Sequence, residues 1–181
     1  MLFGYGADKR VIYGLLMALA IFSLYSMGPE GWYSILITLP AVIIAISFHE
    51  FAHANAADKL GDTTPRNQGR LTLNPISHLD FFGFILMMFA HIGWGKPVEI
   101  NPNNFNSNKS RGFCEAMVAL AGPLMNFFIA IVSCAIYVVV YEVLKPNFVF
   151  TNIGGILEHF LLLLIYVDVG LGVFNLIQTP F

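Results

Sequence analysis

Long apolar segments alternate with short polar ones along the chain, and this pattern predicts a polytopic helical membrane protein. The apolar segments cover about residues 11–27, 32–60, 113–144 and 156–177. A helix of about 20 apolar residues crosses the hydrocarbon core of a bilayer. Because each segment is close to or above this length, we predict four transmembrane helices.

The stretch between the second and third apolar segments has a different pattern. Arg70 to Pro75 alternates polar and apolar residues and ends at a proline, which predicts a short strand. Lys96 to Pro102 is a second candidate strand, and the two are expected to pair. Phe81 to Trp94 is apolar but short for a span, so we predict a re-entrant segment. The predicted fold class is an all-α polytopic membrane protein with about four transmembrane helices, a short re-entrant segment and a small membrane-associated β-hairpin or sheet.

The composition excludes an ordinary soluble domain. Hydrophobic residues make up 57% of the 181 residues and charged residues only 11%, whereas soluble domains carry about 25% charged residues. The lipid bilayer is therefore the expected environment. The sequence lacks a basic patch with interleaved aromatic residues, so nucleic acid is not an expected partner. Without a linker or an internal repeat, residues 1–181 are predicted to form a single membrane-embedded domain.

The basic residues predict the orientation in the membrane. With four spans and a re-entrant middle, only Lys145 falls on one side, and all other basic residues fall on the opposite side. Basic residues are enriched on the cytoplasmic side of membrane proteins. Both termini are therefore predicted to be cytoplasmic, most simply in the cell membrane. The residues on that side are Lys9, Arg10, Lys59, Arg66, Arg70, Lys96, Lys109 and Arg111.

The second apolar segment carries a candidate metal site at His49, Glu50 and His53. On a helix, residues four apart project from the same face, so His49 and His53 can hold one Zn²⁺. Glu50 can take the proton of an attacking water molecule and pass it to the leaving amine. Ionisable residues are costly inside a membrane, and chance alone gives this motif in about 4 of 1,000 chains of this composition. We predict a zinc site in which Glu50 is catalytic.

Further motifs accompany this one, in a fixed order along the chain. They are His49-Glu50-Phe51-Ala52-His53, Gly69-Arg70-Leu71-Thr72-Leu73-Asn74-Pro75, His78-Leu79-Asp80, Gly93-Trp94-Gly95-Lys96-Pro97-Val98, Ala121-Gly122-Pro123-Leu124-Met125-Asn126 and Phe174-Asn175-Leu176. Over about residues 40–181 the chain resembles the site-2 protease family of intramembrane zinc metalloproteases. The resemblance implies a catalytic core at about residues 32–181 that cleaves membrane-spanning protein substrates in regulated intramembrane proteolysis. It also implies that the predicted strands receive an unfolded substrate as an added strand.

The resemblance implies a role for Asn126. In this family the asparagine of the Gly-Pro-x-x-Asn motif faces the active site, so Asn126 is a candidate catalytic residue that contacts the substrate or the oxyanion. The alternative interpretation is an ordinary hydrogen bond between two membrane helices.

A catalytic zinc ion usually has three protein ligands, and the third is not evident in this sequence. In the resembled family it is an aspartate of a Leu-Asp-Gly motif that follows an asparagine and prolines. Here the sequence stops at Phe181, before such an aspartate, and Gln178 stands where a proline is usual. We expect a chain truncated before this motif; the alternatives are another mode of metal binding or none. Asp168 is a candidate substitute ligand, but it lies about two turns from the expected position, which favours a hydrogen bond to a neighbouring helix.

Two other functions are compatible with the sequence. The missing third ligand would suit a catalytically inactive homologue that acts as a chaperone or regulator of membrane segments. A metal-ion transporter is a weaker alternative, because transporters often have repeated halves and none is found here. The sequence does not identify the substrate, and a homo-oligomer is possible.

Overall fold

The computed structural model describes residues 9–81, 83–84, 95–106, 108–143 and 151–178. The predicted re-entrant segment, Phe81 to Trp94, lies almost wholly outside the described residues. The elements in chain order are α1 (Lys9–Ser26), α2 (Pro29–Lys59), α3 (Thr64–Asn67), the 3₁₀ helices η1 (Pro75–Ser77) and η2 (Pro102–Asn104), α5 (Arg111–Val143) and α7 (Asn152–Gln178).

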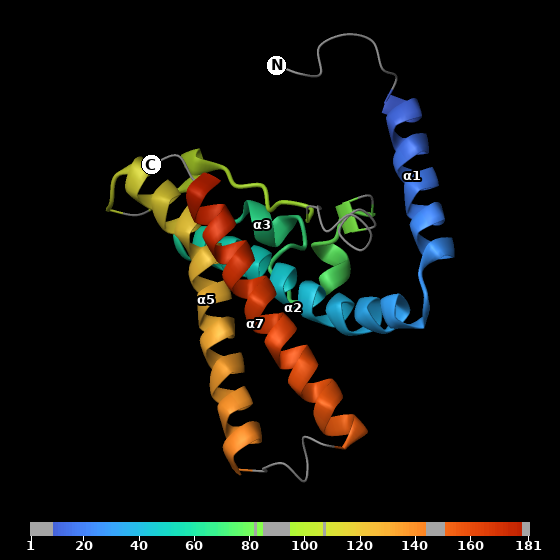
Figure 1. The fold of residues 1–181 in the computed structure, drawn as a ribbon. Coiled ribbons are helices and arrows are strands. Elements are labelled where there is room, and N and C mark those ends of the chain that lie inside the picture. Colours follow the sequence, from blue (N-terminus) through green and yellow to red (C-terminus); the bar gives the residue numbers. More distant parts are fainter. Residues whose placement is uncertain (1–8, 82, 85–94, 107, 144–150, 179–181) are drawn as a thin grey trace.

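Three long helices, α2, α5 and α7, form a bundle (Figure 1). Among the described residues these are the helices that are long and apolar enough to cross a membrane. Their apolar composition explains why they form, because a helix satisfies all its backbone hydrogen bonds internally where water is absent. The second, third and fourth predicted spans are thus confirmed as helices of sufficient length.

Small residues allow the three helices to approach closely. Helix α2 is rich in buried alanines, and α5 and α7 both pack against this helix. The fully or almost fully buried apolar residues of the bundle include Ala41, Ala45, Ala52, Ala54, Ala57, Val118, Ala130, Leu161 and Leu164.

The predicted first span forms a helix, but a fourth membrane span is not confirmed. Helix α1 covers the expected residues, yet it is not among the three candidate spans found in the described residues. It stands away from the bundle in Figure 1. Several of its apolar side chains, such as Leu15 and Phe22, are more than 60% exposed.

The first predicted strand is wrong. Over Arg70–Pro75 the backbone bends, and Pro75 then begins η1. Nearby side chains take the backbone donors that a strand would use: Thr72 Oγ1 accepts from Asn74 N at 3.1 Å, and Asn74 Oδ1 accepts from Ile76 N at 3.1 Å. Such local side-chain bonds compete with strand pairing.

The second predicted strand is also absent from the described residues. The described residues contain one isolated antiparallel bridge, between Leu79 and Gly95, and neither residue belongs to a predicted strand. Residues 95–106, which we call the strap, instead lie along the C-terminal part of α2. Four backbone N–H groups fasten the strap: Lys96 N to His78 O (2.8 Å), Val98 N to Glu50 Oε2 (2.9 Å), Asn101 N to Asp62 Oδ2 (2.6 Å) and Asn106 N to Leu60 O (2.8 Å).

Asp62 is the main anchor of the strap. Its carboxylate is fully buried and accepts hydrogen bonds from Thr64, Asn101 and Asn104. Burial would raise the pKa of Asp62, but these hydrogen bonds outweigh it and hold the pKa below its ordinary value. Gly61, with φ of +105°, makes the turn, and a Cβ at this position would lie 2.8 Å from the backbone nitrogen of Asn106.

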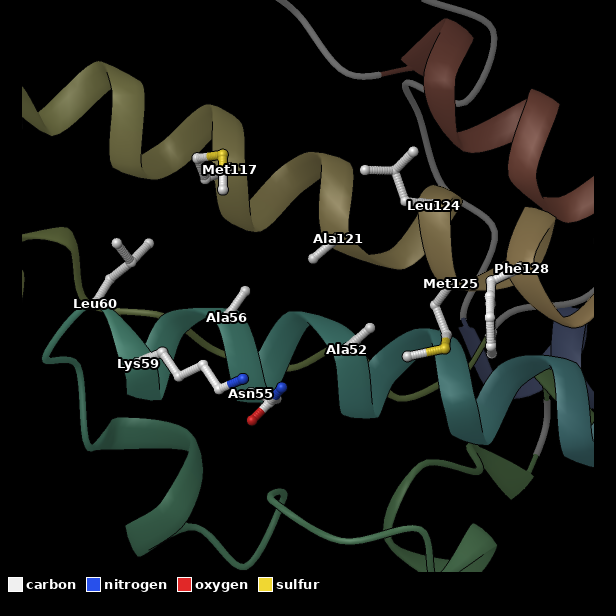
Figure 2. A pocket seen from close by; sticks show the side chains of 10 residues that line it. All are labelled: Ala52, Asn55, Ala56, Lys59, Leu60, Met117, Ala121, Leu124, Met125 and Phe128. Carbon is white, nitrogen blue, oxygen red and sulfur yellow. The ribbon is translucent and has the colours of Figure 1, made fainter.

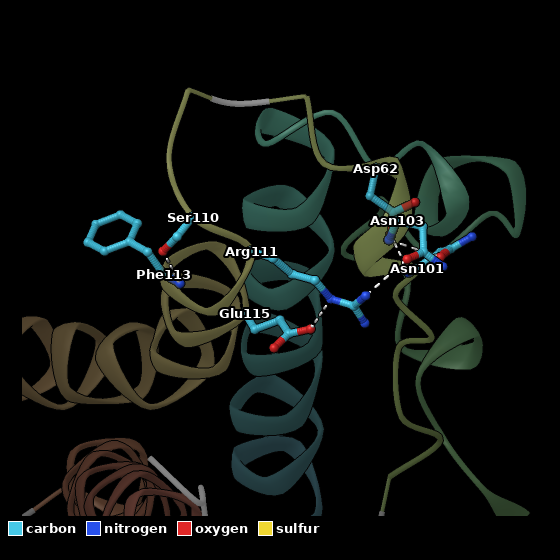
Figure 3. A network of polar contacts seen from close by, with 7 residues as sticks. All are labelled: Asp62, Asn101, Asn103, Ser110, Arg111, Phe113 and Glu115. Carbon is cyan, nitrogen blue, oxygen red and sulfur yellow. Dashed lines mark hydrogen bonds and ion pairs between the residues drawn. The ribbon is translucent and has the colours of Figure 1, made fainter.

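The strap is also fastened to the start of α5. Figure 3 shows Arg111 reaching Asn103 and Glu115. The guanidinium donates to Asn103 Oδ1 at 3.0 Å and to Glu115 Oε1 at 2.9 Å. The strap therefore joins the ends of two helices that, as shown below, carry the candidate site.

We expect Asp62→Ala to destabilise the protein by about 2–4 kcal/mol, because buried donors lose a charged acceptor. The measurement is denaturant unfolding of the purified protein, with hydrogen exchange of the strap as a local readout.

Glu115→Ala is the matched control. It removes a carboxylate from an exposed ion pair on the same side of the molecule, and such a pair contributes at most about 1 kcal/mol. Equal losses in the two variants would show that Asp62 does not anchor the strap.

Candidate metal centre

His49 and His53 lie one turn apart on α2, and their imidazoles converge. The two Nε2 atoms are 3.0 Å apart, and the ring planes are nearly perpendicular, at 82°. The prediction that the two side chains share one face of the helix is thus confirmed in the structure. His49 is buried and His53 is half-buried.

The opposite ring nitrogens are held by α5. His53 Nδ1 donates to the carbonyl oxygen of Val118 at 2.7 Å, and His49 Nδ1 donates to Asn126 Oδ1 at 3.0 Å. Both Nε2 atoms then carry lone pairs that face each other. Two lone pairs at this separation repel each other unless they share a cation. Fixing one ring nitrogen so that the other is free to bind is the usual support for a histidine metal ligand.

Gly122 forms the wall of the space in front of the two imidazoles. A Cβ at this position would clash with His53 Nε2 and would lie 2.6 Å from His49 Nε2. Any side chain here would therefore occupy the space where the two nitrogens converge. The donor set and this open cradle fit a zinc ion, which prefers imidazole nitrogen at about 2.0–2.1 Å.

Glu50 is partly buried next to His49 and is positioned by the strap. Its Oε2 accepts the backbone N–H of Val98 at 2.9 Å. The bond occupies one carboxylate oxygen and leaves lone pairs available for a proton. Glu50 thus follows His49 on α2 and carries a carboxylate whose orientation is restricted by the strap.

Asn126 is fully buried and contacts His49 through Oδ1, whereas its Nδ2 has no hydrogen-bond partner among the described residues. The interhelical hydrogen bond anticipated for this residue is therefore present, and its partner is a candidate metal ligand. Its predicted contact with substrate or oxyanion stays a prediction, and the free Nδ2 donor is the group that could make it.

The structure does not join Asp168 to the histidine pair. Asp168 lies on α7 and is fully buried, but in the described part of the chain neither of its carboxylate oxygens has a hydrogen-bond partner. The expected bond to a neighbouring helix is thus not found there. Over the same residues, no group of three or more His, Cys, Asp or Glu side chains is placed to hold a metal.

His78, in the His78-Leu79-Asp80 motif, makes hydrogen bonds that hold the surrounding chain segments together. Its Nε2 donates to Thr72 O at 2.7 Å, and its backbone oxygen accepts from Lys96 in the strap. Burial lowers the pKa of His78, so the ring is kept neutral.

Two supporting groups escaped the sequence analysis because they are backbone atoms. The carbonyl of Val118 and the N–H of Val98 act regardless of residue type, so no side-chain pattern marks them. Gly122 belongs to a motif that the sequence analysis named, Ala121-Gly122-Pro123-Leu124-Met125-Asn126. Its closeness to both imidazoles became visible only with α5 packed against α2.

Comparison with known proteins gives one informative match. Over 139 residues, 77% of this chain, the sequence is 36% identical to "Putative zinc metalloprotease YwhC" of Bacillus subtilis (strain 168). The match covers 61% of the length of that protein. This similarity supports a metalloprotease family for the chain. No family model matches the sequence, and no solved structure matches it.

We expect Gly122→Ala to abolish stoichiometric zinc binding, because the added methyl group would enter the space between the two Nε2 atoms. The measurement is elemental analysis of the purified variant after incubation with zinc.

Gly170→Ala on α7 is the matched control, since a Cβ there meets no atom within 4 Å. If Gly122→Ala binds as much zinc as Gly170→Ala, the metal does not lie in front of the two imidazoles.

Asp168→Asn should leave the zinc content unchanged, because Asp168 is not grouped with the histidines. Stability should be unchanged or higher, since a neutral amide costs less to bury than a carboxylate. Elemental analysis and denaturant unfolding measure the two effects. Loss of zinc in this variant would instead identify Asp168 as a ligand.

Proposed function

We propose that this protein is an intramembrane zinc metalloprotease that hydrolyses peptide bonds of membrane-spanning substrates. The observation that carries the proposal is the convergence of His49 Nε2 and His53 Nε2 at 3.0 Å, with both Nδ1 atoms anchored on α5. The similarity to a protein named as a zinc metalloprotease supports the same chemistry.

His49 and His53 would hold the zinc ion, with a further ligand still to be assigned. A bound zinc ion supplies Lewis acidity, which brings the pKa of a water molecule near 7 and polarises a carbonyl group. Glu50 then accepts the proton of the attacking water on its free carboxylate oxygen and delivers it to the leaving amine. The Val98 N–H limits the rotation of the carboxylate, and so directs the free oxygen.

The proposed reaction takes place inside a candidate membrane span. His49 precedes Lys59, the last residue of α2, by ten positions, which corresponds to about 15 Å along the helix axis. Water would reach the site from this polar end, where the strap and Glu50 meet. The charge distribution predicts that this end is cytoplasmic. We propose the cell membrane as the location, and regulated intramembrane proteolysis as the process.

Asn126 has a dual role in this proposal. Its Oδ1 fixes the orientation of His49, while Nδ2 donates to the substrate carbonyl or to the oxyanion that forms from it. The family resemblance supports such a contact.

A catalytically inactive homologue is the second candidate function. The observation in its favour is that the described residues contain no group of three side chains able to hold a metal. Such a protein would bind membrane segments without cleaving them, and would show neither stoichiometric zinc nor peptide-bond hydrolysis.

Glu50→Gln should retain zinc but reduce cleavage by about 10²–10⁴-fold or more, because the amide still accepts the Val98 N–H but cannot carry the proton.

His49→Ala should weaken zinc binding by more than about 100-fold. Loss of a residue that only supports a metal ligand weakens metal binding by at most about this factor, and loss of the ligand itself should cost more. Cleavage is measured by product mass on a panel of single-span membrane proteins in proteoliposomes, and zinc by elemental analysis.

Glu115→Gln, which alters an exposed carboxylate on α5, is the control for both measurements. Proteolysis that persists in Glu50→Gln contradicts the mechanism. Absence of both stoichiometric zinc and proteolysis in the unaltered protein would favour the inactive homologue.

A further inference from the structure

An apolar groove lies between α2 and α5 (Figure 2), and two of its lining residues, Ala52 and Ala121, are sequence neighbours of His53 and Gly122. Three alanines form its floor, and larger side chains of α5 form its rim. The groove has a volume of about 560 Å³. Its lining residues are Ala52, Asn55, Ala56, Lys59, Leu60, Met117, Ala121, Leu124, Met125 and Phe128.

The rim of the groove faces the membrane. Leu124 is 60% exposed, and Phe128 is 61% exposed. Both belong to a helix that is apolar enough to span a bilayer, so the groove opens sideways into the region of the acyl chains. The distance from Met117 to Phe128 along α5 is about 16 Å. The groove is therefore elongated along α5.

The polar end of the groove carries the positive charge of Lys59, which has no ion-pair partner among the residues that the structure describes. Figure 2 shows Lys59 and Asn55 side by side on α2, with the Lys59 amino group turned along the helix toward Asn55. Asp58 is already paired with Arg66, and Asp62 accepts the hydrogen bonds of the strap. Lys59 belongs to neither of the two ion pairs found among the described residues.

The charge at the polar end of the groove favours a lipid as the occupant. One acyl chain can lie along the apolar lining formed by Ala52, Ala56 and Ala121. A lysine at the end of a membrane helix lies at the level of the lipid headgroups, where a phosphate would complement its charge.

We propose that the α2–α5 groove binds an anionic phospholipid, with one acyl chain against Ala52, Ala56 and Ala121 and the phosphate at Lys59 and Asn55. The sequence predicts that the Lys59 end is cytoplasmic, and the cytoplasmic leaflet is the one that carries anionic lipid. The proposal is independent of proteolysis, because it uses neither the histidines nor Glu50.

The test compares lipid retention by native mass spectrometry. The full chain is reconstituted in vesicles of equal amounts of dioleoyl phosphatidylglycerol and dioleoyl phosphatidylcholine, and is then extracted in mild detergent. We expect one phosphatidylglycerol retained per chain, in preference to phosphatidylcholine. Lys59→Gln should lower this preference about fivefold, whereas Lys96→Gln, which removes an exposed charge from the strap, should leave it unchanged.

A second pair of variants tests the apolar part of the groove. Ala56→Phe fills the floor and should abolish retention of both lipids, whereas Val139→Phe places the same ring at an exposed position of α5 outside the groove and should not. Circular dichroism and size-exclusion chromatography verify that the variants fold. An unchanged lipid preference in Lys59→Gln, or full retention in a folded Ala56→Phe variant, overturns the proposal.

A photo-crosslinking residue at Leu124 distinguishes a lipid from a protein occupant in the native membrane. A mass increase of one phospholipid supports the proposal. Crosslinking to a polypeptide, with no phospholipid adduct, overturns it.

Discussion

The structure depends on one constraint: polar groups inside an apolar helix bundle need partners, because they cannot exchange hydrogen bonds with water. His53 meets this requirement through the carbonyl of Val118, and His49 through Asn126. Both bonds use Nδ1, so the two Nε2 atoms are left facing each other at 3.0 Å. The packing of α5 on α2 thereby determines which nitrogen atoms are available, and a shared cation is the simplest partner for both.

The strap applies the same constraint to the carboxylates at the end of α2. Asp62 binds four donors from the chain around it, and Glu50 binds one, from Val98. One carboxylate is thus nearly saturated and serves as an anchor. The Glu50 carboxylate keeps free lone pairs, which is what a proton acceptor requires. The same segment of backbone therefore connects the stability of the loop to the orientation of the candidate base.

The long helices and the histidine pair could be predicted from the sequence, because both follow from regular helix geometry. Apolar length fixes α2, α5 and α7, and a spacing of four residues puts His49 and His53 on one face. The predicted hairpin is wrong. The alternation of polar and apolar residues between Arg70 and Pro75 does not reveal that the Thr72 and Asn74 side chains bond to the local backbone.

The supports of the site could not be read from residue types. Val98 and Val118 contribute backbone atoms, and only the packed structure brings those atoms to Glu50 and His53. Asp168 shows the opposite case. Its carboxylate lies inside an apolar segment and is therefore a candidate ligand from the sequence. Among the described residues, however, it forms no metal-binding group with the histidines. The spacing of residues in the sequence shows which side chains share one face of a helix. It does not show how the neighbouring helix is rotated against that face.

Zinc X-ray absorption spectroscopy on the zinc-loaded protein tests the central claim most directly. The account predicts one zinc ion with two imidazole ligands at about 2.0–2.1 Å and no sulfur ligand, and loss of the imidazole signal when His49 and His53 are both replaced by alanine. A spectrum without two imidazoles, or one that the double replacement leaves unchanged, would contradict it.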